Sequence, residues 1–361
     1  MRLTCRLLMV AGMATTLHAC GTKPTSPSSD CDGCRIELFR VATISDSIDR
    51  GALPDQMIHA MGDPSRGIFV TARERTKVFA FRSAGESVSV IGRAGDGPGE
   101  FRSARRLFVG PGDSLFVSDW GSGRISVFSP DDKFVRTQRL PHFPAFALDD
   151  GRFIVADQLD GARQGGRPLL LMGKDGAPVG SFGPEIPTGR PPQRLFERRL
   201  AAPARNGGVW AVAPGRYTLE RWDAATGALR ASIPIRTAWF AETASWPEDE
   251  RVRPPAVVES LWEDRDGLVW FLIRVADSNW KPRAQPNVER AVDAVEYDQT
   301  YDWMVEVVDP RSGAVLASRR SPAALWGRPP SSLLVSARAI EPDETARFDV
   351  WSARLVRQDP K

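Results

Sequence analysis

Histidine and cysteine are scarce in this chain, and their scarcity limits the chemistry it can support. The 361 residues include three histidines and four cysteines. A signal peptide over residues 1–19 would remove His18, leaving His59 and His142, too few for a zinc centre with several histidine ligands. Neither G-x-S-x-G nor H-E-x-x-H occurs. The sequence therefore favours a non-catalytic protein over a hydrolase or a zinc enzyme.

Long hydrophobic runs are missing as well, apart from one at the N-terminus. Arg2 and Arg6 flank the start of a short apolar stretch that includes LLMVAGMATTL, which has the form of an export signal and is too short to span a bilayer. Leu17, Ala19 and Cys20 resemble the lipobox of bacterial lipoproteins. That resemblance implies that residues 1–19 are removed and that Cys20 carries the lipid. An ordinary cleaved signal on a secreted protein is the alternative.

The same resemblance implies a location. A lipid on Cys20 would make the membrane a partner of an exported protein of the bacterial cell envelope. Gly21 follows the lipid site, which in such lipoproteins goes with sorting to the outer membrane. Without residues 1–19 the chain carries a net charge of about +1, which argues against a nucleic-acid partner.

The remaining cysteines, Cys31 and Cys34, form a C-x-x-C pair. Such a pair is compatible with a redox couple, half of a zinc site or a local disulfide. A second pair of zinc ligands is missing, and the pair lies between a Ser/Thr/Pro-rich stretch and a predicted strand. Because exported thiols tend to pair, we expect a structural disulfide. Residues 20–34 are expected to form a flexible tether.

Residues 91–101, IGRAGDGPGEF, hold four glycines. A phosphate-binding loop would need a G-K-[ST] ending, and a dinucleotide fingerprint would need G-x-G-x-x-G opening a helix. Neither pattern fits, and a strand pattern follows. We therefore interpret the segment as a tight crossing between strands, in which Glu100 caps backbone amides.

Short strand-like segments repeat along residues 35–361. Residues 106–140 read as a four-stranded meander whose turns are PGD, GSG and PDDK. Five clear units and a sixth partial one predict an all-β fold, a six-bladed β-propeller of four-stranded antiparallel blades. We expect residues 35–44 to complete the last blade and close the ring. The second strands of the units begin near Phe69, Phe116, Ile154, Trp210, Trp270 and Leu334.

The segment RLFVGPGDSLFVSDWGSGRISVFSPDDKFV resembles an NHL-type repeat, and the chain is similar to bacterial six-bladed propeller lipoproteins related to NHL proteins. The resemblance implies the fold and says little about activity. Some six-bladed propellers are lactonases that hold calcium with oxygen ligands. Four acidic residues near predicted strand ends could be ligands of a calcium ion: Asp119, Asp157, Glu259 and Asp264. Acidic residues at such positions are usually turn formers, however.

Three insertions interrupt the meander, at residues 183–205, 236–255 and 286–303. Their tryptophans, Trp239, Trp246 and Trp280, are the candidates for ligand contact. We expect a lipid-anchored binding or interaction module for a protein or glycan, with no catalytic residues and no cofactor. A calcium-dependent hydrolase or lactonase that uses the central channel is the alternative.

Overall fold

The computed structural model describes residues 31, 33–45, 60–63, 65–72, 74–81, 87–156, 166–185, 196, 198–247, 249, 251–282, 300–327, 331–337 and 347–357. The predicted signal peptide, Cys20 and His59 lie outside these residues. Within them, no helix is both long enough and apolar enough to cross a membrane.

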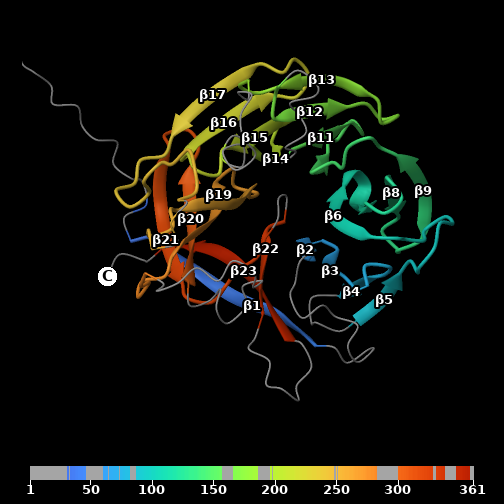
Figure 1. Ribbon diagram of the computed structural model, residues 1–361, viewed down its shortest axis with the longest axis horizontal. Helices are drawn as coiled ribbons and strands as arrows, with labels where there is room; N and C mark the ends of the chain where they lie inside the picture. The colour runs from blue at the N-terminus through green and yellow to red at the C-terminus, as the bar shows by residue number, and fades with distance from the viewer. Residues whose placement is uncertain are drawn as a thin grey trace, which may run out of the picture.

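The strands form six antiparallel sheets arranged in a ring (Figure 1). Five of the sheets pair four consecutive strands in chain order. Blades one and two contain β2 (Ala60–Asp63), β3 (Gly67–Thr71), β4 (Val78–Phe81), β5 (Ser87–Ile91), β6 (Ala104–Gly110), β7 (Ser114–Asp119), β8 (Arg124–Phe128) and β9 (Phe134–Arg139). A 3₁₀ turn, η1 (Pro111–Asp113), joins β6 to β7.

The next three blades have the same organisation. They contain β10 (Phe146–Ala147), β11 (Phe153–Val155), β12 (Leu169–Met172), β13 (Pro178–Phe182), β14 (Leu200–Ala204), β15 (Gly208–Val212), β16 (Thr218–Asp223), β17 (Leu229–Pro234), β18 (Val257–Glu263), β19 (Val269–Ala276), β20 (Tyr301–Asp309) and β21 (Ala314–Ser321). The fold is a six-bladed β-propeller, as the sequence predicted.

The sixth blade joins the two ends of the chain. Its sheet has the order β1 (Arg35–Ser45), β23 (Arg347–Val356), β22 (Leu333–Ala337). The register of β1 on β23 runs from Arg35 opposite Val356 to Ser45 opposite Arg347. Trp326 pairs with Val335 in an isolated antiparallel bridge, which marks a rudimentary first strand. The prediction that residues 35–44 complete the last blade and close the ring is confirmed.

The core lies between neighbouring blades. Strand β4 is buried along its whole length, and so is β15, because both sides of a central strand face another blade. The outer strand β9 is mostly exposed. The fully buried aromatic side chains include Phe69, Phe108 and Phe271. Burying each contributes roughly 1.5–3 kcal/mol, so packing between neighbouring blades is a main source of the stability of the ring.

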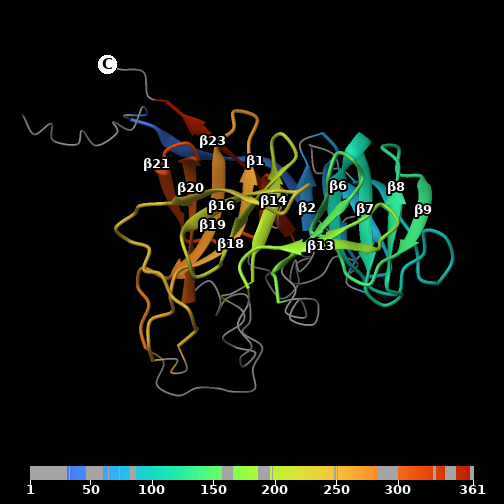
Figure 2. The same ribbon diagram turned by 90° about the horizontal axis from the view of Figure 1, so that it is seen from above.

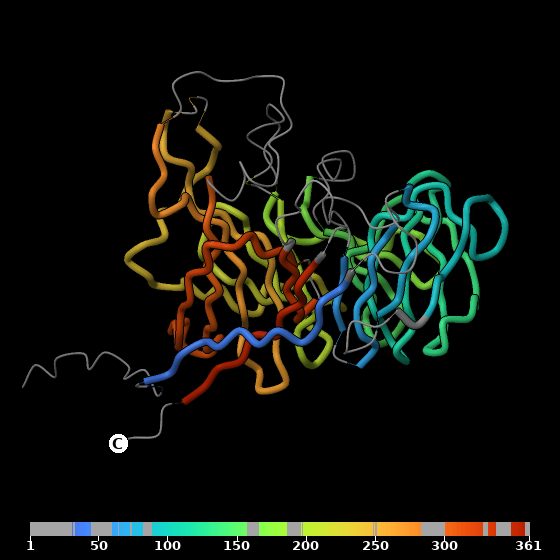
Figure 3. The backbone as a smooth tube through the Cα atoms, turned by 90° about the horizontal axis from the view of Figure 1, so that it is seen from below, coloured from blue at the N-terminus to red at the C-terminus, as the bar shows by residue number. Residues whose placement is uncertain are grey.

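The two faces of the ring differ in the length of their connections. Where the first strand joins the second and the third joins the fourth, the described blades use five residues or fewer, as at 205–207 and 264–268. We call this side the turn face. The remaining connections lie on the opposite side, the loop face, which carries residues 92–103, 235–256 and 277–282. Figure 2 and Figure 3 show the long connections of blades four and five on one side and the start of β1 and end of β23 toward the other.

Candidate functional site

The insertion at residues 235–256 is the longest well-described connection on the loop face, and it is packed onto blade four. The Thr243 amide donates to the Gly215 carbonyl at 2.9 Å. A Cβ on Gly215 would lie 2.2 Å from the Thr243 carbonyl oxygen and 2.5 Å from the Phe196 ring. Glycine at this position therefore allows the insertion to lie directly against the 213–217 loop.

A buried carboxylate fixes the start of the insertion. Glu306 on β20 is fully buried, and its carboxylate accepts from Tyr217 Oη at 2.5 Å, Trp239 Nε1 at 2.9 Å and Ser318 Oγ at 2.6 Å. Three neutral donors thus satisfy a charged group inside the protein. Trp239 was predicted to contact a ligand. Its indole N–H is bonded to Glu306, while 37% of the residue remains exposed.

Tyr217 is the centre of this cluster. Its ring stacks on Phe240 with centroids 4.7 Å apart and meets Phe271 edge-on at 5.2 Å. Burial raises the pKa of Tyr217 well above its usual value, and the negative charge of Glu306 raises it further. The phenol therefore keeps its proton and remains a donor at every physiological pH.

The second predicted contact residue, Trp246, covers the inner part of blade five. Its ring stacks on Phe196 at 6.3 Å and lies 5.2 Å from the guanidinium of Arg274. Arg274 also lies over the Tyr301 ring at 4.7 Å and pairs with Glu259 at 2.9 Å. The indole is half-buried, and its position is set by residues from three separate connections and strands.

The third, Trp280, lies on the neighbouring loop of blade five. It is half-buried, and its amide donates to the Asp277 carbonyl at 3.1 Å. Arg253 from the insertion donates to the same carbonyl at 3.3 Å. The structure therefore brings the insertion and the 277–282 loop together on the loop face. Exposed side chains complete the surface: Val252, which is 52% exposed, Arg251 and Arg253.

The acids proposed for calcium mostly serve the framework. Asp264 accepts from the Trp270 indole at 2.7 Å and from the amides of its own turn, and Glu259 pairs with Arg274. Asp119 is buried and hydrogen-bonded, and Asp157 lies outside the described residues. Among the residues that the structure describes, no group of three or more His, Cys, Asp or Glu could hold a metal ion.

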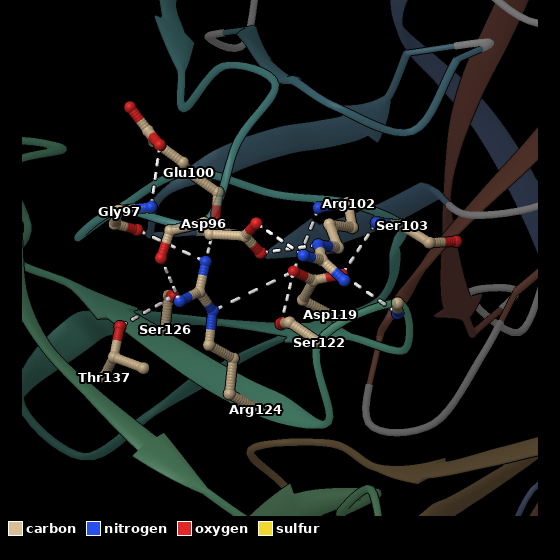
Figure 4. A network of polar contacts seen from close by, with 11 residues as sticks. Asp96, Gly97, Glu100, Arg102, Ser103, Asp119, Ser122, Arg124, Ser126 and Thr137 are labelled. Atoms are coloured by element: carbon tan, nitrogen blue, oxygen red, sulfur yellow. Dashed lines mark hydrogen bonds and ion pairs between the residues drawn. The ribbon is translucent and has the colours of Figure 1, made fainter.

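The glycine-rich crossing between blades one and two shapes another part of the loop face (Figure 4). Glu100 accepts from the Gly97 amide at 2.7 Å and from Arg93 at 2.7 Å, so its predicted capping role is present. The Gly97 amide and then Arg93 lower the pKa of Glu100. Arg124 donates to the carbonyls of Gly97 and Glu100 at 3.2 and 2.7 Å. The segment is a turn held by its own Glu100 and Arg93 and by Arg124 from β8.

At the N-terminal end, Cys31 and Cys34 are joined by a disulfide with Cα atoms 5.3 Å apart. The pair immediately precedes β1 on the turn face. Cys20, the predicted lipid site, is not among the described residues.

Sequence reasoning missed the residues that hold these surfaces together. Glu306 lies in DWMVEVVD, a strand in which polar and apolar positions give no sign that a carboxylate is buried. Its partner Tyr217 is 89 residues away. Trp120, which is 48% exposed, was not among the tryptophans predicted to contact a ligand. The surroundings of Glu306 and of Trp120 are seen only in the arrangement of the blades.

Comparison with known proteins agrees with the fold. Residues 56–162 match a family model described as "6-bladed beta-propeller". The matched residues include strands β2 to β11 of the observed propeller. A candidate exported protein from Bacteroides fragilis NCTC 9343 is similar over 87% of this chain and 94% of its own, with 12% identity and a TM-score of 0.54.

More distant structures are also similar. A streptogramin B lyase has 12% identity and a TM-score of 0.44 over 89% of this chain and 98% of its own. A luciferin-regenerating enzyme has 11% identity and a TM-score of 0.44 over 86% and 94%. No curated protein matches. At these identities the likeness concerns the fold alone.

Proposed function

We propose that this protein is a non-catalytic binding module of the bacterial cell envelope, held on the outer membrane by a lipid on Cys20, and that its loop face binds a protein partner. One observation carries the proposal: the longest described connections, residues 92–103 and 235–256, both lie on the loop face, whereas the first-to-second and third-to-fourth strand connections of blades one to five on the turn face have five residues or fewer. Binding residues are typically presented on loops that a rigid scaffold positions.

The composition of the insertion favours a protein partner over a glycan. Trp239, Val252 and Arg253 lie on one connection and are exposed. Tryptophan and arginine are enriched among the residues that dominate binding energy at protein interfaces. The hydrogen bond that the Trp239 indole donates to Glu306 holds the insertion before a partner arrives, so little ordering entropy is lost on binding.

The direction of β1 supports the proposed anchoring. Arg35 starts β1 on the turn face, opposite Val356, the last residue of β23. A lipid on Cys20 would therefore attach the turn face to the membrane and direct the loop face away from it. The candidate exported relative from B. fragilis agrees with an envelope location.

Crosslinking in intact cells tests the proposal. A photocrosslinking amino acid at position 252 should give one discrete protein adduct, and the same residue at position 179, which is 60% exposed on the outer strand β13, should not. The adduct identifies the partner for purification. V252D should then weaken its affinity about tenfold or more because a charge enters an interface contact, while the matched variant V179D should leave the affinity unchanged.

Two results would count against this function. If V252D and V179D lowered the affinity for the partner equally, the insertion would not be part of the interface. Binding of purified envelope polysaccharide without any protein adduct would favour the glycan alternative, and ester or lactone turnover that EDTA abolishes would favour the calcium-dependent hydrolase.

A further inference from the structure

A second cluster on the loop face lies over blades one to three, away from the insertion. Trp120, the first residue after β7, stacks on Phe143 with ring centroids 5.2 Å apart and 11° between the ring planes. The guanidinium of Arg105 lies 5.0 Å from the centroid of the same indole. Arg105 is only partly buried, so the aromatic stack orients a cation that solvent can reach.

Hydrogen bonds between backbone groups bring the loop that carries a second arginine, Arg75, to the start of β6. The Ala104 amide donates to the Arg75 carbonyl at 2.8 Å, and the Trp120 amide donates to the Ser103 carbonyl at 2.9 Å. Arg75 has a positive φ of 61°. The loop of blade one that carries Arg75 is thereby attached directly to the start of β6, where Arg105 lies.

Asp119 makes this arrangement rigid. Its carboxylate is fully buried and accepts from the amides of Ser103 at 2.7 Å and Gly121 at 3.1 Å, and from Ser122 Oγ at 2.6 Å (Figure 4). It lies 3.9 Å from the Arg124 guanidinium. Asp119 thus ties the strand that carries Arg105 to the turn that carries Trp120, and its charge is already engaged.

Within the described residues, neither Arg75 nor Arg105 has a carboxylate partner. Arg105 has a 3.5 Å contact with Ser103 Oγ. The pKa of Arg105 is lowered, first by partial burial and then by the positive charge of Arg75. Asp96 pairs with Arg102 at 2.5 Å, and Glu74, which precedes Arg75, lies 3.9 Å from Lys77. Among the residues that the structure describes, the like charges of Arg75 and Arg105 influence each other and no carboxylate pairs with either, an arrangement that an anion would stabilise.

Two other arginines with largely buried side chains have carboxylate partners. Arg66 pairs with Asp132 at 2.6 Å, and Arg199 donates to both carboxylate oxygens of Glu220 at 3.0 and 2.8 Å. In those places the guanidinium joins neighbouring strands or blades. Arg221, which lies over the Trp210 ring at 5.5 Å, instead donates to the Arg205 carbonyl at 3.1 Å, whereas the described residues give the guanidinium of Arg105 only the 3.5 Å contact with Ser103.

We propose that Arg105, held beside the Trp120–Phe143 stack, and Arg75, from the loop bonded to the start of β6, form a binding site for one oxyanion group, a carboxylate or a phosphate, of a small acidic ligand that enters from the loop face. Guanidinium groups bind both anions through paired N–H donors. The exposed edge of Trp120 offers an apolar wall for the rest of the ligand. This site shares no residue with the insertion and does not depend on a protein partner there.

Calorimetric titration of the purified mature protein with three related sugars tests the site. Glucuronate carries a carboxylate, glucose 6-phosphate carries a phosphate and glucose carries neither. We expect saturable binding of at least one of the two anions and no binding of glucose. Binding of glucuronate would identify the group as a carboxylate, and binding of glucose 6-phosphate would identify it as a phosphate. R105Q and R75Q should each weaken the bound anion about tenfold, since each removes charge-assisted hydrogen bonds. R105K should fall between R105Q and the unaltered protein.

The control is R136Q, which removes an exposed arginine from the outer strand β9. It should leave the affinity unchanged. Equal weakening by R136Q, no effect of R75Q and R105Q, or absence of binding by both anions would overturn the proposal. If R105Q fails to fold, as judged by its thermal transition, R75Q alone decides, because Arg75 lies in a surface turn outside the core.

Discussion

Glu306 places a negative charge in the interior between blades four and five. Hydrogen bonds from three donors offset the cost of removing its carboxylate from water. Each donor comes from a different segment: Tyr217 from the loop before β16, Trp239 from the insertion and Ser318 from β21. A buried carboxylate that loses a donor retains its desolvation cost. Single residues in this cluster should therefore affect stability more than their exposure suggests.

Replacement of Tyr217 with phenylalanine removes one of those donors without removing the ring. We expect Y217F to lower the free energy of unfolding by about 1.5–3 kcal/mol, because the bond is made to a charged acceptor. Guanidinium chloride unfolding followed by tryptophan fluorescence measures the change. A loss smaller than about 0.5 kcal/mol, the usual range for surface substitutions, would show that the bond contributes little.

The raised pKa of Tyr217 gives the same residue a signature at high pH. Above the unfolded tyrosine value of about 10, the folded protein keeps a proton that the unfolded chain releases, so stability falls as pH rises through the folded pKa. Of the three tyrosines, Tyr217 should ionise only as the protein unfolds, giving a late step in absorbance at 295 nm. Y217F should lack this step and Y301F should keep it. Complete ionisation before unfolding would contradict the assignment.

At the scale of elements, the crossing at residues 91–101 shows why local sequence predicted some features and not others. The four glycines can be read from the sequence, but the reason that glycine is needed at each position is seen only in the backbone angles and contacts of the folded segment. Gly95 has a φ of +148°, and a Cβ there would lie 2.1 Å from the Glu100 carboxylate. Glycine spacing alone predicted a turn and the cap by Glu100. The dependence on Arg124, which arrives from β8, required the fold.

Substitution of Gly95 with alanine tests this element. The new methyl group would displace the Glu100 carboxylate from the Gly97 amide and strain the backbone, so G95A should cost roughly 1–3 kcal/mol. G180A is the matched control, because a Cβ on Gly180 meets nothing within 4 Å. Thermal or chemical unfolding of the two variants gives the comparison. Equal stability of both would mean that the crossing accommodates side chains freely.

The strands themselves were predictable because propeller blades repeat a simple pattern. Phe69, Phe116, Ile154, Trp210 and Trp270 lie in the second strands β3, β7, β11, β15 and β19, as expected. Leu334 lies in β22, whose preceding strand is reduced to the Trp326 bridge. The candidate sites were less predictable. Arg105, Trp120 and Phe143 become neighbours only when blade two is folded against the connection to blade three.

For the molecule as a whole, the two faces of the ring have different roles in our account. The turn face is closed by short connections and ion pairs such as Arg66 with Asp132, and β1 starts there. The loop face carries the insertion and the proposed oxyanion site at separate positions. A lipid on Cys20 would turn the loop face away from the membrane, where ligands and partners arrive.

Hydroxyl-radical footprinting of the protein in isolated cell envelopes tests whether a partner covers the loop face of the anchored protein. Oxidation of Trp239 and Val252 on the loop face should be lower in the envelope than after detergent extraction and purification, because a partner covers them. Phe134, at the turn-face end of β9, and Val179 should show no protection by a partner, and C20A should be recovered in the soluble fraction with all four residues oxidised. Protection confined to Phe134 and Val179, or equal oxidation of Trp239 and Val252 in both preparations, would contradict the account.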